Sequence, residues 1–230
     1  MECDKRRVQI IAMIKAVFFD LDGTLINTMG DIVANVEWLL ANNGMGRADG
    51  GQVHPIERYR QMVGNGARVL VQMATGAQGA QLDDYLAQYN AHYLQHSTEH
   101  SVPYDGVEQT VAALRERGVK LFVLTNKPQP QAQQVIAKFF PPQTFEAVLG
   151  GGIGFPAKPD PAVVFEALKR ADCTSEQALF VGDSDVDIFT ARNAGLTSVG
   201  VGWGFRGPQE LRRAGADHII DDAAQLLELV

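Results

Sequence analysis

Aspartates gather just after short apolar runs of this chain. Asp20 ends the first run and Asp22 follows it, while Asp183 and Asp187 follow a later run. If these runs are parallel strands of an open sheet, ligands bind beyond their carboxyl ends. Two carboxylates ~4 Å apart repel by ~4 kcal/mol at an effective dielectric constant of about 20. These acids therefore predict a cation bound among them.

Mg²⁺ is the cation that suits this chemistry. It prefers oxygen ligands, keeps several waters, and takes one or two carboxylates together with phosphate oxygens. The chain has a formal net charge of -7, and Lys127 and Lys158 are the lysines in the expected loops beside the acids. A bound dication would offset both the acidic cluster and the charge of an incoming phosphate group.

The same side chains could transfer a phosphoryl group. The Asp20 carboxylate can attack phosphorus and form an aspartyl-phosphate. Asp22, two residues on, can protonate the leaving oxygen and then activate water. Thr125, the backbone of Asn126 and Lys158 could hold the phosphoryl oxygens as charge develops.

Strands and helices are expected to alternate over most of the chain. The expected strands are Ile14–Asp20, Lys120–Thr125, Phe145–Leu149, Ala178–Val181, Thr197–Val201 and His218–Ile220. The expected helices are Val107–Arg117, Pro161–Ala171, Asp187–Ala194 and Asp222–Leu229. The strand runs are short and apolar, as in strands buried on both faces. This alternation predicts an α/β fold with a Rossmann-like, mostly parallel sheet.

Residues 28–101 interrupt the alternation. Helical patterns occupy Asp31–Asn42, Ile56–Ala74 and Leu82–His96. Because no strong strand pattern separates them, we expect a small, four-helix-like cap domain inserted after the first strand.

The rest of the chain divides around this insertion. Residues 14–27 and 102–230 are expected to form the core domain. Val102–Gly106 is interpreted as the linker from the cap back to the core. Residues 1–13 are expected to be a disordered extension.

Four segments carry a family resemblance. In chain order they are Asp20–Leu25 (DLDGTL), Leu124–Asn126 (LTN), Lys158–Pro159 (KP) and Gly182–Asp187 (GDSDVD). They resemble the four motifs of the haloacid dehalogenase superfamily in order and spacing, and the likeness spans residues 14–230. A helical insertion after the first motif is similar to one cap type of that superfamily.

The resemblance implies a role for each acid. Asp20 would be the nucleophile and a metal ligand. Asp22 would be the acid and base, and its backbone carbonyl would bind Mg²⁺. Asp183 would bind the metal, and Asp187 would support the metal or the lysine.

A narrower likeness concerns the substrate. Val63–Arg68, Pro103–Val107 and Thr125–Pro128 are similar to segments of phosphoglycolate phosphatases. The likeness implies 2-phosphoglycolate as substrate, with contacts from Thr125, Asn126, Lys158, Gly64, Asn65, Gly66 and Arg68. The two glycines could let cap backbone amides approach the substrate closely. The glycine-rich segment Gly150–Pro156 departs from the pattern, so the loop before Lys158 is expected to differ in shape.

Two other functions remain open. A sugar-phosphate mutase, similar to β-phosphoglucomutase, would use the same aspartyl-phosphate, need a bisphosphate activator and release little phosphate. A non-catalytic regulator that binds a phosphorylated ligand would show no turnover, and the intact pair of Asp20 and Asp22 counts against it. Asp22 also argues against a dehalogenase, because the dehalogenase members of the superfamily lack an acid at that position.

Composition argues against several partners. The acidic chain shows no basic stripe with interleaved aromatics, so we expect no nucleic-acid partner. No apolar run approaches the ~20 residues that span a bilayer, so we expect no membrane partner. Cys3 and Cys173 have no CxxC spacing, which fits a reducing cytoplasm. The expected partner is a small phosphorylated metabolite.

Two further motifs are interpreted as structural. Gly202–Gly207 matches GxGxxG, but Trp203 and Phe205 occupy the approach and only one short strand follows. We therefore expect a loop bordering the active site, not a dinucleotide site. His92 and His96 begin a run of histidines at helical spacing, continued by His100, and we expect a solvated helix face there rather than a second metal site.

Overall fold

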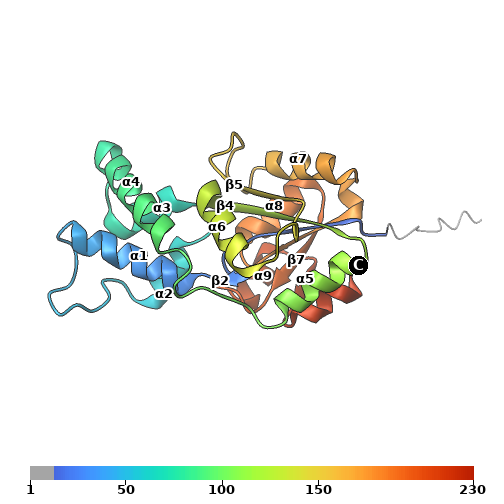
Figure 1. Cartoon of the computed structure of the whole chain (residues 1–230), viewed down its shortest axis with the longest axis horizontal. Helices are drawn as coiled ribbons and strands as arrows, with labels where there is room; N and C mark the ends of the chain where they lie inside the picture. Colours follow the sequence, from blue (N-terminus) through green and yellow to red (C-terminus); the bar gives the residue numbers. More distant parts are fainter. Residues whose placement is uncertain (1–12) are drawn as a thin grey trace, which may run out of the picture.

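Six parallel strands form the centre of the molecule. The computed structural model describes residues 13–230, and in it the sheet has the order β5-β4-β1-β6-β7-β8 (Figure 1). The strands are β1 Ala16–Phe19, β4 Lys120–Pro128, β5 Ala147–Gly151, β6 Ala178–Gly182, β7 Thr197–Val201 and β8 His218–Ile220. The expected strands are all found, with ends that differ by up to three residues. The predicted α/β fold is confirmed.

Both faces of the sheet are covered because the strands are apolar on both faces. In β1, Val17 and Phe19 pack into one core cluster, and Ala16 and Phe18 pack into the other, as the two-residue period of a strand requires. Helices α5 Val107–Glu116 and α6 Gln129–Phe139 cover the first face, and α7 Ala162–Ala171 and α8 Asp185–Ala194 cover the second. The short helix α9 Pro208–Ala214 packs against α8.

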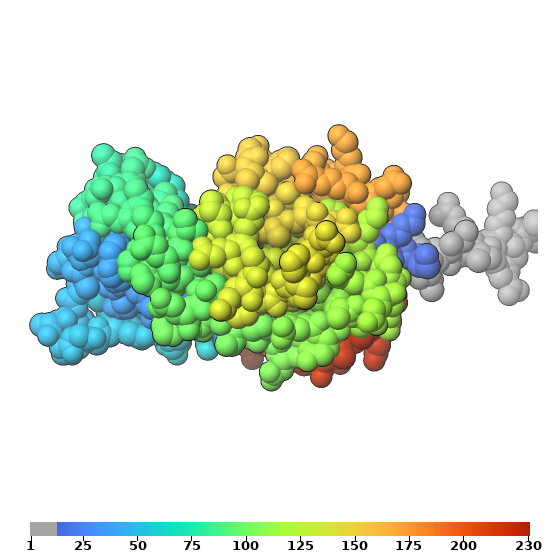
Figure 2. All heavy atoms as spheres, in the orientation of Figure 1, coloured from blue at the N-terminus to red at the C-terminus, as the bar shows by residue number. Residues whose placement is uncertain are grey.

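Four further helices form a separate helical unit with its own core. They are α1 Met29–Asn42, α2 Ile56–Met62, α3 Ala67–Thr75 and α4 Gly79–Gln95. The unit lies beyond the carboxyl ends of β1 and β4 and forms the left lobe in Figures 1 and 2. Helix α4 packs against α6 of the other lobe, where Gln131 Nε2 donates a hydrogen bond to Asn90 Oδ1 at 3.0 Å.

The chain enters and leaves the helical unit at one place. Strand β2 Ile26–Asn27 pairs antiparallel with β3 Val102–Pro103. The buried carboxylate of Asp31, at the start of α1, accepts hydrogen bonds from the backbone amides of Glu99 and His100 and from the hydroxyl of Ser101. These contacts hold the two crossing segments side by side.

The structure differs from several predicted elements. The helix expected over Ile56–Ala74 is two helices, because Gly64 and Gly66 adopt positive φ angles of 112° and 85° that interrupt helical geometry. The helix expected over Asp222–Leu229 is a 3₁₀ helix, Ala223–Glu228. Helices α6 and α9 were not predicted, because one begins with a Gln- and Pro-rich turn and the other has only seven residues.

Some expectations concern the ends of the chain or the membrane. The predicted extension over residues 1–13 lies outside the described residues except for Met13, and so does Cys3. Over residues 13–230, no helix combines the length and the apolar character needed to cross a bilayer.

Candidate active site

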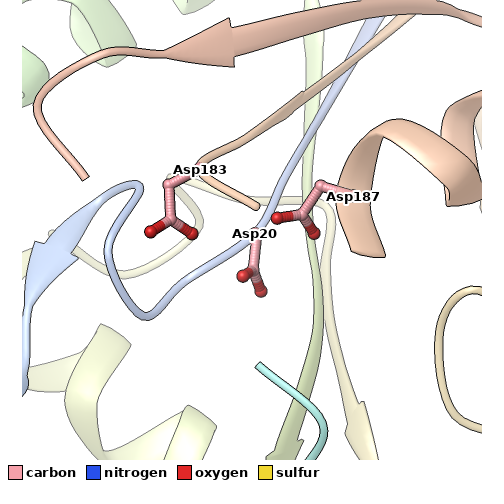
Figure 3. A group of neighbouring side chains, drawn as sticks. All are labelled: Asp20, Asp183 and Asp187. Atoms are coloured by element: carbon pink, nitrogen blue, oxygen red, sulfur yellow. The ribbon is translucent and has the colours of Figure 1, made fainter. Parts of the chain in front are cut away.

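Three of the predicted acids lie together at the carboxyl edge of the sheet. Strand register explains this: Phe19 lies between Val123 of β4 and Val181 of β6, so the chain leaves the sheet at Asp20 close to the end of β6. Carboxylate oxygens of Asp20, Asp183 and Asp187 lie within 4.8 Å of one another. Figure 3 shows the three side chains converging, and all three are buried.

Lys158 joins two of these acids. Its Nζ atom lies 2.7 Å from Asp187 Oδ1 and 2.9 Å from Asp20 Oδ1. Burial alone would lower the pKa of this lysine, but the charges of Asp187 and Asp20 outweigh it and raise the pKa. Lys158 therefore stays a cation at neutral pH.

Burial makes the ionised forms of Asp20 and Asp183 less favourable. Burial raises the pKa of Asp20 to about 6; Asp187 and Asp22 add to the rise, and Lys158 opposes it. Burial, followed by the charges of Asp187 and Asp20, raises the pKa of Asp183 well above its usual value. The site therefore favours any cation that can share these oxygens.

Asp187 is fixed through both of its oxygens. It lies in the first turn of α8, where Oδ2 accepts hydrogen bonds from the backbone amide of Ser184 at 3.1 Å and from the Ser184 hydroxyl at 2.7 Å. Its other oxygen accepts from Lys158. Acidic residues are favoured in the first turn of a helix, so Asp187 both caps α8 and orients Lys158.

Asp183 is held by the loop that follows β7. The backbone amide of Phe205 donates to Asp183 Oδ2 at 2.7 Å. A Cβ atom on Gly204 would lie 2.2 Å from Asp183 Cβ, and one on Gly23 would lie 2.3 Å from Asp183 Oδ2. Glycine at these two positions therefore permits close approach, and the GxGxxG segment forms a loop at the acidic cluster.

Asp22 lies apart from the three clustered acids and contacts a second lysine. Lys127 Nζ lies 3.0 and 3.3 Å from the two Asp22 oxygens and donates to Tyr93 Oη at 2.8 Å. The hydroxyl of Thr28 also donates to Asp22 Oδ1 at 2.7 Å. Lys127 was expected beside the acids as a local cation, but it was not among the predicted site residues. Nothing in the sequence pattern indicated that Tyr93, in α4, reaches this point.

A cavity beside Asp20 is lined by both lobes. From the α/β lobe its lining includes Asp20, Asp22, Thr125, Asn126, Lys127 and Gln131. From the helical unit its lining includes Gly64, Gly66 and Tyr89. Asn126 connects the lobes, because its Nδ2 atom donates to the carbonyl oxygens of Gly64 at 2.9 Å and Lys158 at 3.1 Å. Its Oδ1 atom accepts from the Lys158 amide at 2.8 Å.

Two of the predicted substrate contacts lie elsewhere. Arg68 is exposed and its guanidinium pairs with Asp83 at 2.6 Å. Asn65 is also exposed, and neither residue lines the cavity. Asn65 precedes Gly66 and Arg68 lies two residues after it. Because Gly66 does line the cavity, the likeness in this segment located the loop but not the side chains that face the cavity.

The acidic cluster fits a hard divalent cation. The three clustered carboxylates and the one ammonium group beside them, that of Lys158, leave two negative charges in excess. Asp20 Oδ1 is buried and lies at ion-pair distance from Lys158, but no donor is aligned for a hydrogen bond to it. Carboxylate oxygens are the ligands that Mg²⁺ prefers. Asp20 and Asp183 are the residues best placed to hold the ion.

The histidines of α4 and its end do not form a metal cluster among residues 13–230. The ring of His92 stacks on Trp38 and on His96, and His96 pairs with Glu99 at 2.7 Å. Partial burial, together with the charge of His96, lowers the pKa of His92.

Comparison with known proteins gives a consistent result. Residues 17–201 match the family described as haloacid dehalogenase-like hydrolase. The chain is 36% identical over 220 residues to a phosphoglycolate phosphatase from Pseudomonas putida, covering 93% of this chain and 78% of that one. It is 33% identical over 225 residues to a phosphoglycolate phosphatase from Haemophilus influenzae, covering 94% and 98% of the two chains.

A solved structure agrees with these relatives. The crystal structure of a predicted phosphoglycolate phosphatase from Haemophilus somnus shares 30% identity and a TM-score of 0.85, covering 94% of this chain and 97% of that one. The chain therefore belongs to the haloacid dehalogenase-like hydrolase family. The predicted resemblance to phosphoglycolate phosphatases within that family is confirmed.

Proposed function

We propose that this protein is a Mg²⁺-dependent phosphatase that hydrolyses a small phosphomonoester, with 2-phosphoglycolate as the preferred substrate, through an aspartyl-phosphate on Asp20. The observation that carries the proposal is the convergence of Asp183, Asp187 and Lys158 on Asp20, which itself lines the cavity. The substrate is proposed because the relatives at 33% and 36% identity are phosphoglycolate phosphatases.

In the first half of the reaction, a carboxylate oxygen of Asp20 attacks phosphorus and the bond from phosphorus to the alcohol oxygen breaks. Asp22 gives its proton to that leaving oxygen, so the product departs as an alcohol. Lys158 and Thr125 bind the phosphoryl oxygens and stabilise the charge that develops on them. Mg²⁺, when bound, would supply charge neutralisation and orientation of the phosphate group.

In the second half, the ionised Asp22 takes a proton from water, and that water attacks phosphorus of the aspartyl-phosphate. The acyl–phosphate bond breaks, phosphate is released, and both aspartates return to their starting states. Asp187 does not react; it holds Lys158 in place through the 2.7 Å ion pair.

The helical unit, residues 28–101 in our proposed domain division, acts as the cap. Gly64, Gly66 and Tyr89 of this unit line the same cavity as Asp20, which supports a role in enclosing the substrate and excluding water. The rest of the described chain, residues 14–27 and 102–230, is the proposed core domain. We place the enzyme in the cytoplasm, in keeping with the sparse cysteines.

Phosphate release from a panel of phosphomonoesters, with Mg²⁺ and with EDTA, tests the proposal. We expect release that depends on Mg²⁺, is greatest with 2-phosphoglycolate and needs no bisphosphate activator. Asp20→Asn should fold and release no phosphate. Normal turnover by that variant would contradict the aspartyl-phosphate mechanism, and release only in the presence of a bisphosphate would favour a mutase.

A further inference from the structure

Lys127 lines the cavity beside Asp20 but has no role in the proposed reaction. Among residues 13–230, it is the only cationic side chain in the lining of the cavity beside Asp20. The other nearby lysine, Lys158, contacts Asp20 and Asp187. Lys127 is buried, with 6% of its surface exposed. A buried ammonium needs partners to offset its desolvation, and its main counter-ion is the reacting carboxylate of Asp22.

The Lys127 ammonium is held from two sides. Asp22 accepts from it at 3.0 and 3.3 Å, and Tyr93 Oη accepts at 2.8 Å. The Tyr93 ring also lies beneath it, with the ammonium 4.4 Å from the ring centroid. Tyr93 is fully buried in α4, so the ammonium has a second, fixed contact besides Asp22.

Both oxygens of the Asp22 carboxylate lie close to Lys127 Nζ, at 3.0 and 3.3 Å, so this contact competes with contact to the leaving oxygen of a substrate. In this structure its carboxylate accepts from Lys127 and from Thr28, whereas proton transfer needs it within hydrogen-bond reach of the leaving oxygen. An anion that replaces Asp22 on Lys127 removes this conflict.

We propose that Lys127 is the receptor for a second acidic group on the substrate, and that the group binds by displacing Asp22 from Lys127. The released Asp22 carboxylate takes up a proton from water, turns to the leaving oxygen and gives the proton to it. Lys127 would thus couple recognition of the alcohol part of the substrate to the proton transfer. The inference rests on the proposed function and specifies its substrate class.

The spacing of the site limits that class. Thr125 and Lys127 are two residues apart in β4, the backbone amide of Lys127 donates to the Thr125 hydroxyl at 3.2 Å, and both residues line the cavity. A ligand that bridges them needs its two acidic groups separated by only a few bonds. Phosphomonoesters that carry a carboxylate on the carbon next to the ester oxygen meet this condition.

The test compares two esters of the same size. In 2-phosphoglycolate a carboxylate stands where ethyl phosphate has a methyl group. For the wild-type enzyme, kcat/KM should favour phosphoglycolate by about 100-fold, the scale of one buried charge pair. In Lys127→Gln, which retains a hydrogen-bond donor, this preference should fall to within about threefold. Lys138→Gln removes a positive charge from an exposed position on α6 and should keep the wild-type preference.

The same kinetics separate a binding role from a purely structural one. Coupling to Asp22 predicts that Lys127→Gln loses the preference in kcat as well as in KM. If both esters slow by the same factor and the preference survives, Lys127 only supports the fold and the inference is overturned. If the wild-type enzyme releases phosphate from neither ester, the proposed function fails and this inference fails with it.

A second measurement covers the case in which Lys127→Gln folds poorly. It uses the Asp20→Asn variant with Lys127 intact, and titration calorimetry of each ester in the presence of Mg²⁺. We expect phosphoglycolate to bind about 100-fold more tightly than ethyl phosphate. Equal affinities would overturn the proposal independently of any change at Lys127.

Discussion

The side-chain amide of Asn126 donates a 2.9 Å hydrogen bond to the carbonyl oxygen of Gly64. The first residue ends a motif at the carboxyl end of a sheet strand, and the second lies in the loop between α2 and α3. The same side chain makes two further hydrogen bonds to the backbone of Lys158: Nδ2 donates to its carbonyl oxygen and Oδ1 accepts from its amide. One side chain thus aligns the helical unit with the lysine that contacts Asp20.

Removing this side chain should impair both catalysis and folding. Asn126→Ala deletes three hydrogen bonds, and we expect kcat/KM to fall about 10- to 100-fold, because small displacements of positioning groups are costly. The midpoint of thermal unfolding should also drop by ~6–12 °C, because three hydrogen bonds at about 1 kcal/mol each amount to ~3 kcal/mol. Asn42→Ala, which removes an exposed bond to Gln88, is the matched control and should leave kcat/KM unchanged.

Asp20→Asn should abolish turnover while leaving the fold intact. The amide is a poor nucleophile, so we expect at least a ~10³-fold loss of kcat, measured by phosphate release, with an unchanged far-ultraviolet circular dichroism spectrum. Asp185→Asn makes the same chemical change in the first turn of α8, outside the cluster of three acids, and should keep most of the activity. Comparable losses in both variants would argue against a nucleophilic role for Asp20.

Lys158 should matter for stability as well as for activity. Without its ammonium, the buried carboxylates of Asp20 and Asp187 lose the cation between them. Breaking a buried ion pair by removing one partner costs ~3–5 kcal/mol. We expect Lys158→Ala to lower the free energy of unfolding by about that amount in urea titrations at neutral pH. Lys138→Ala, at an exposed position, should change it by less than ~0.5 kcal/mol.

The stability of the metal-free protein should respond to pH through Asp20. Because burial raises its pKa from 3.8 to about 6, the protonated form is favoured in the folded state. The resulting contribution to stability is complete below pH 3.8 and is lost as pH rises through about 6. The loss amounts to ~3 kcal/mol. The measurement is the free energy of unfolding of wild type and of Asp20→Asn, in EDTA, below pH 3.8 and above about pH 6. The change with pH that is present in wild type and absent from the variant is the contribution of Asp20.

Mg²⁺ binding should show the opposite trend with pH. The ion binds ionised carboxylates, so protons compete with it below the raised pKa of Asp20. We expect the dissociation constant for Mg²⁺, measured by calorimetry, to rise by about tenfold when the pH is lowered from about 7.5 to about 5. An affinity that does not change over this interval would mean that the ion binds away from Asp20.

Much of the site could be predicted because it depends on local pattern and parallel strand order. Asp20 and Asp183 each follow a short apolar run, and the ends of neighbouring parallel strands meet at one edge. The helical unit could be recognised only as a departure from the alternation. The break at Gly64 was hidden because an apolar helical pattern continues on both sides of it.

Contacts between the lobes were beyond the reach of sequence patterns. Tyr93 meets Lys127 because α4 packs across α6, a long-range arrangement that no spacing along the chain encodes. Arg68 illustrates the reverse case. Its segment resembles that of phosphoglycolate phosphatases. However, successive side chains of a helix point to different sides of it, and the Arg68 side chain points to solvent, where it pairs with Asp83.

The antiparallel pair of β2 and β3, together with Asp31, has a consequence for how this architecture can diversify. Since the strands that lead into and out of the helical unit lie side by side, its four helices can be lengthened, shortened or exchanged without changing the register of the central sheet. The groups around Asp20 can then stay as they are while the part of the cavity wall that the helical unit contributes is replaced.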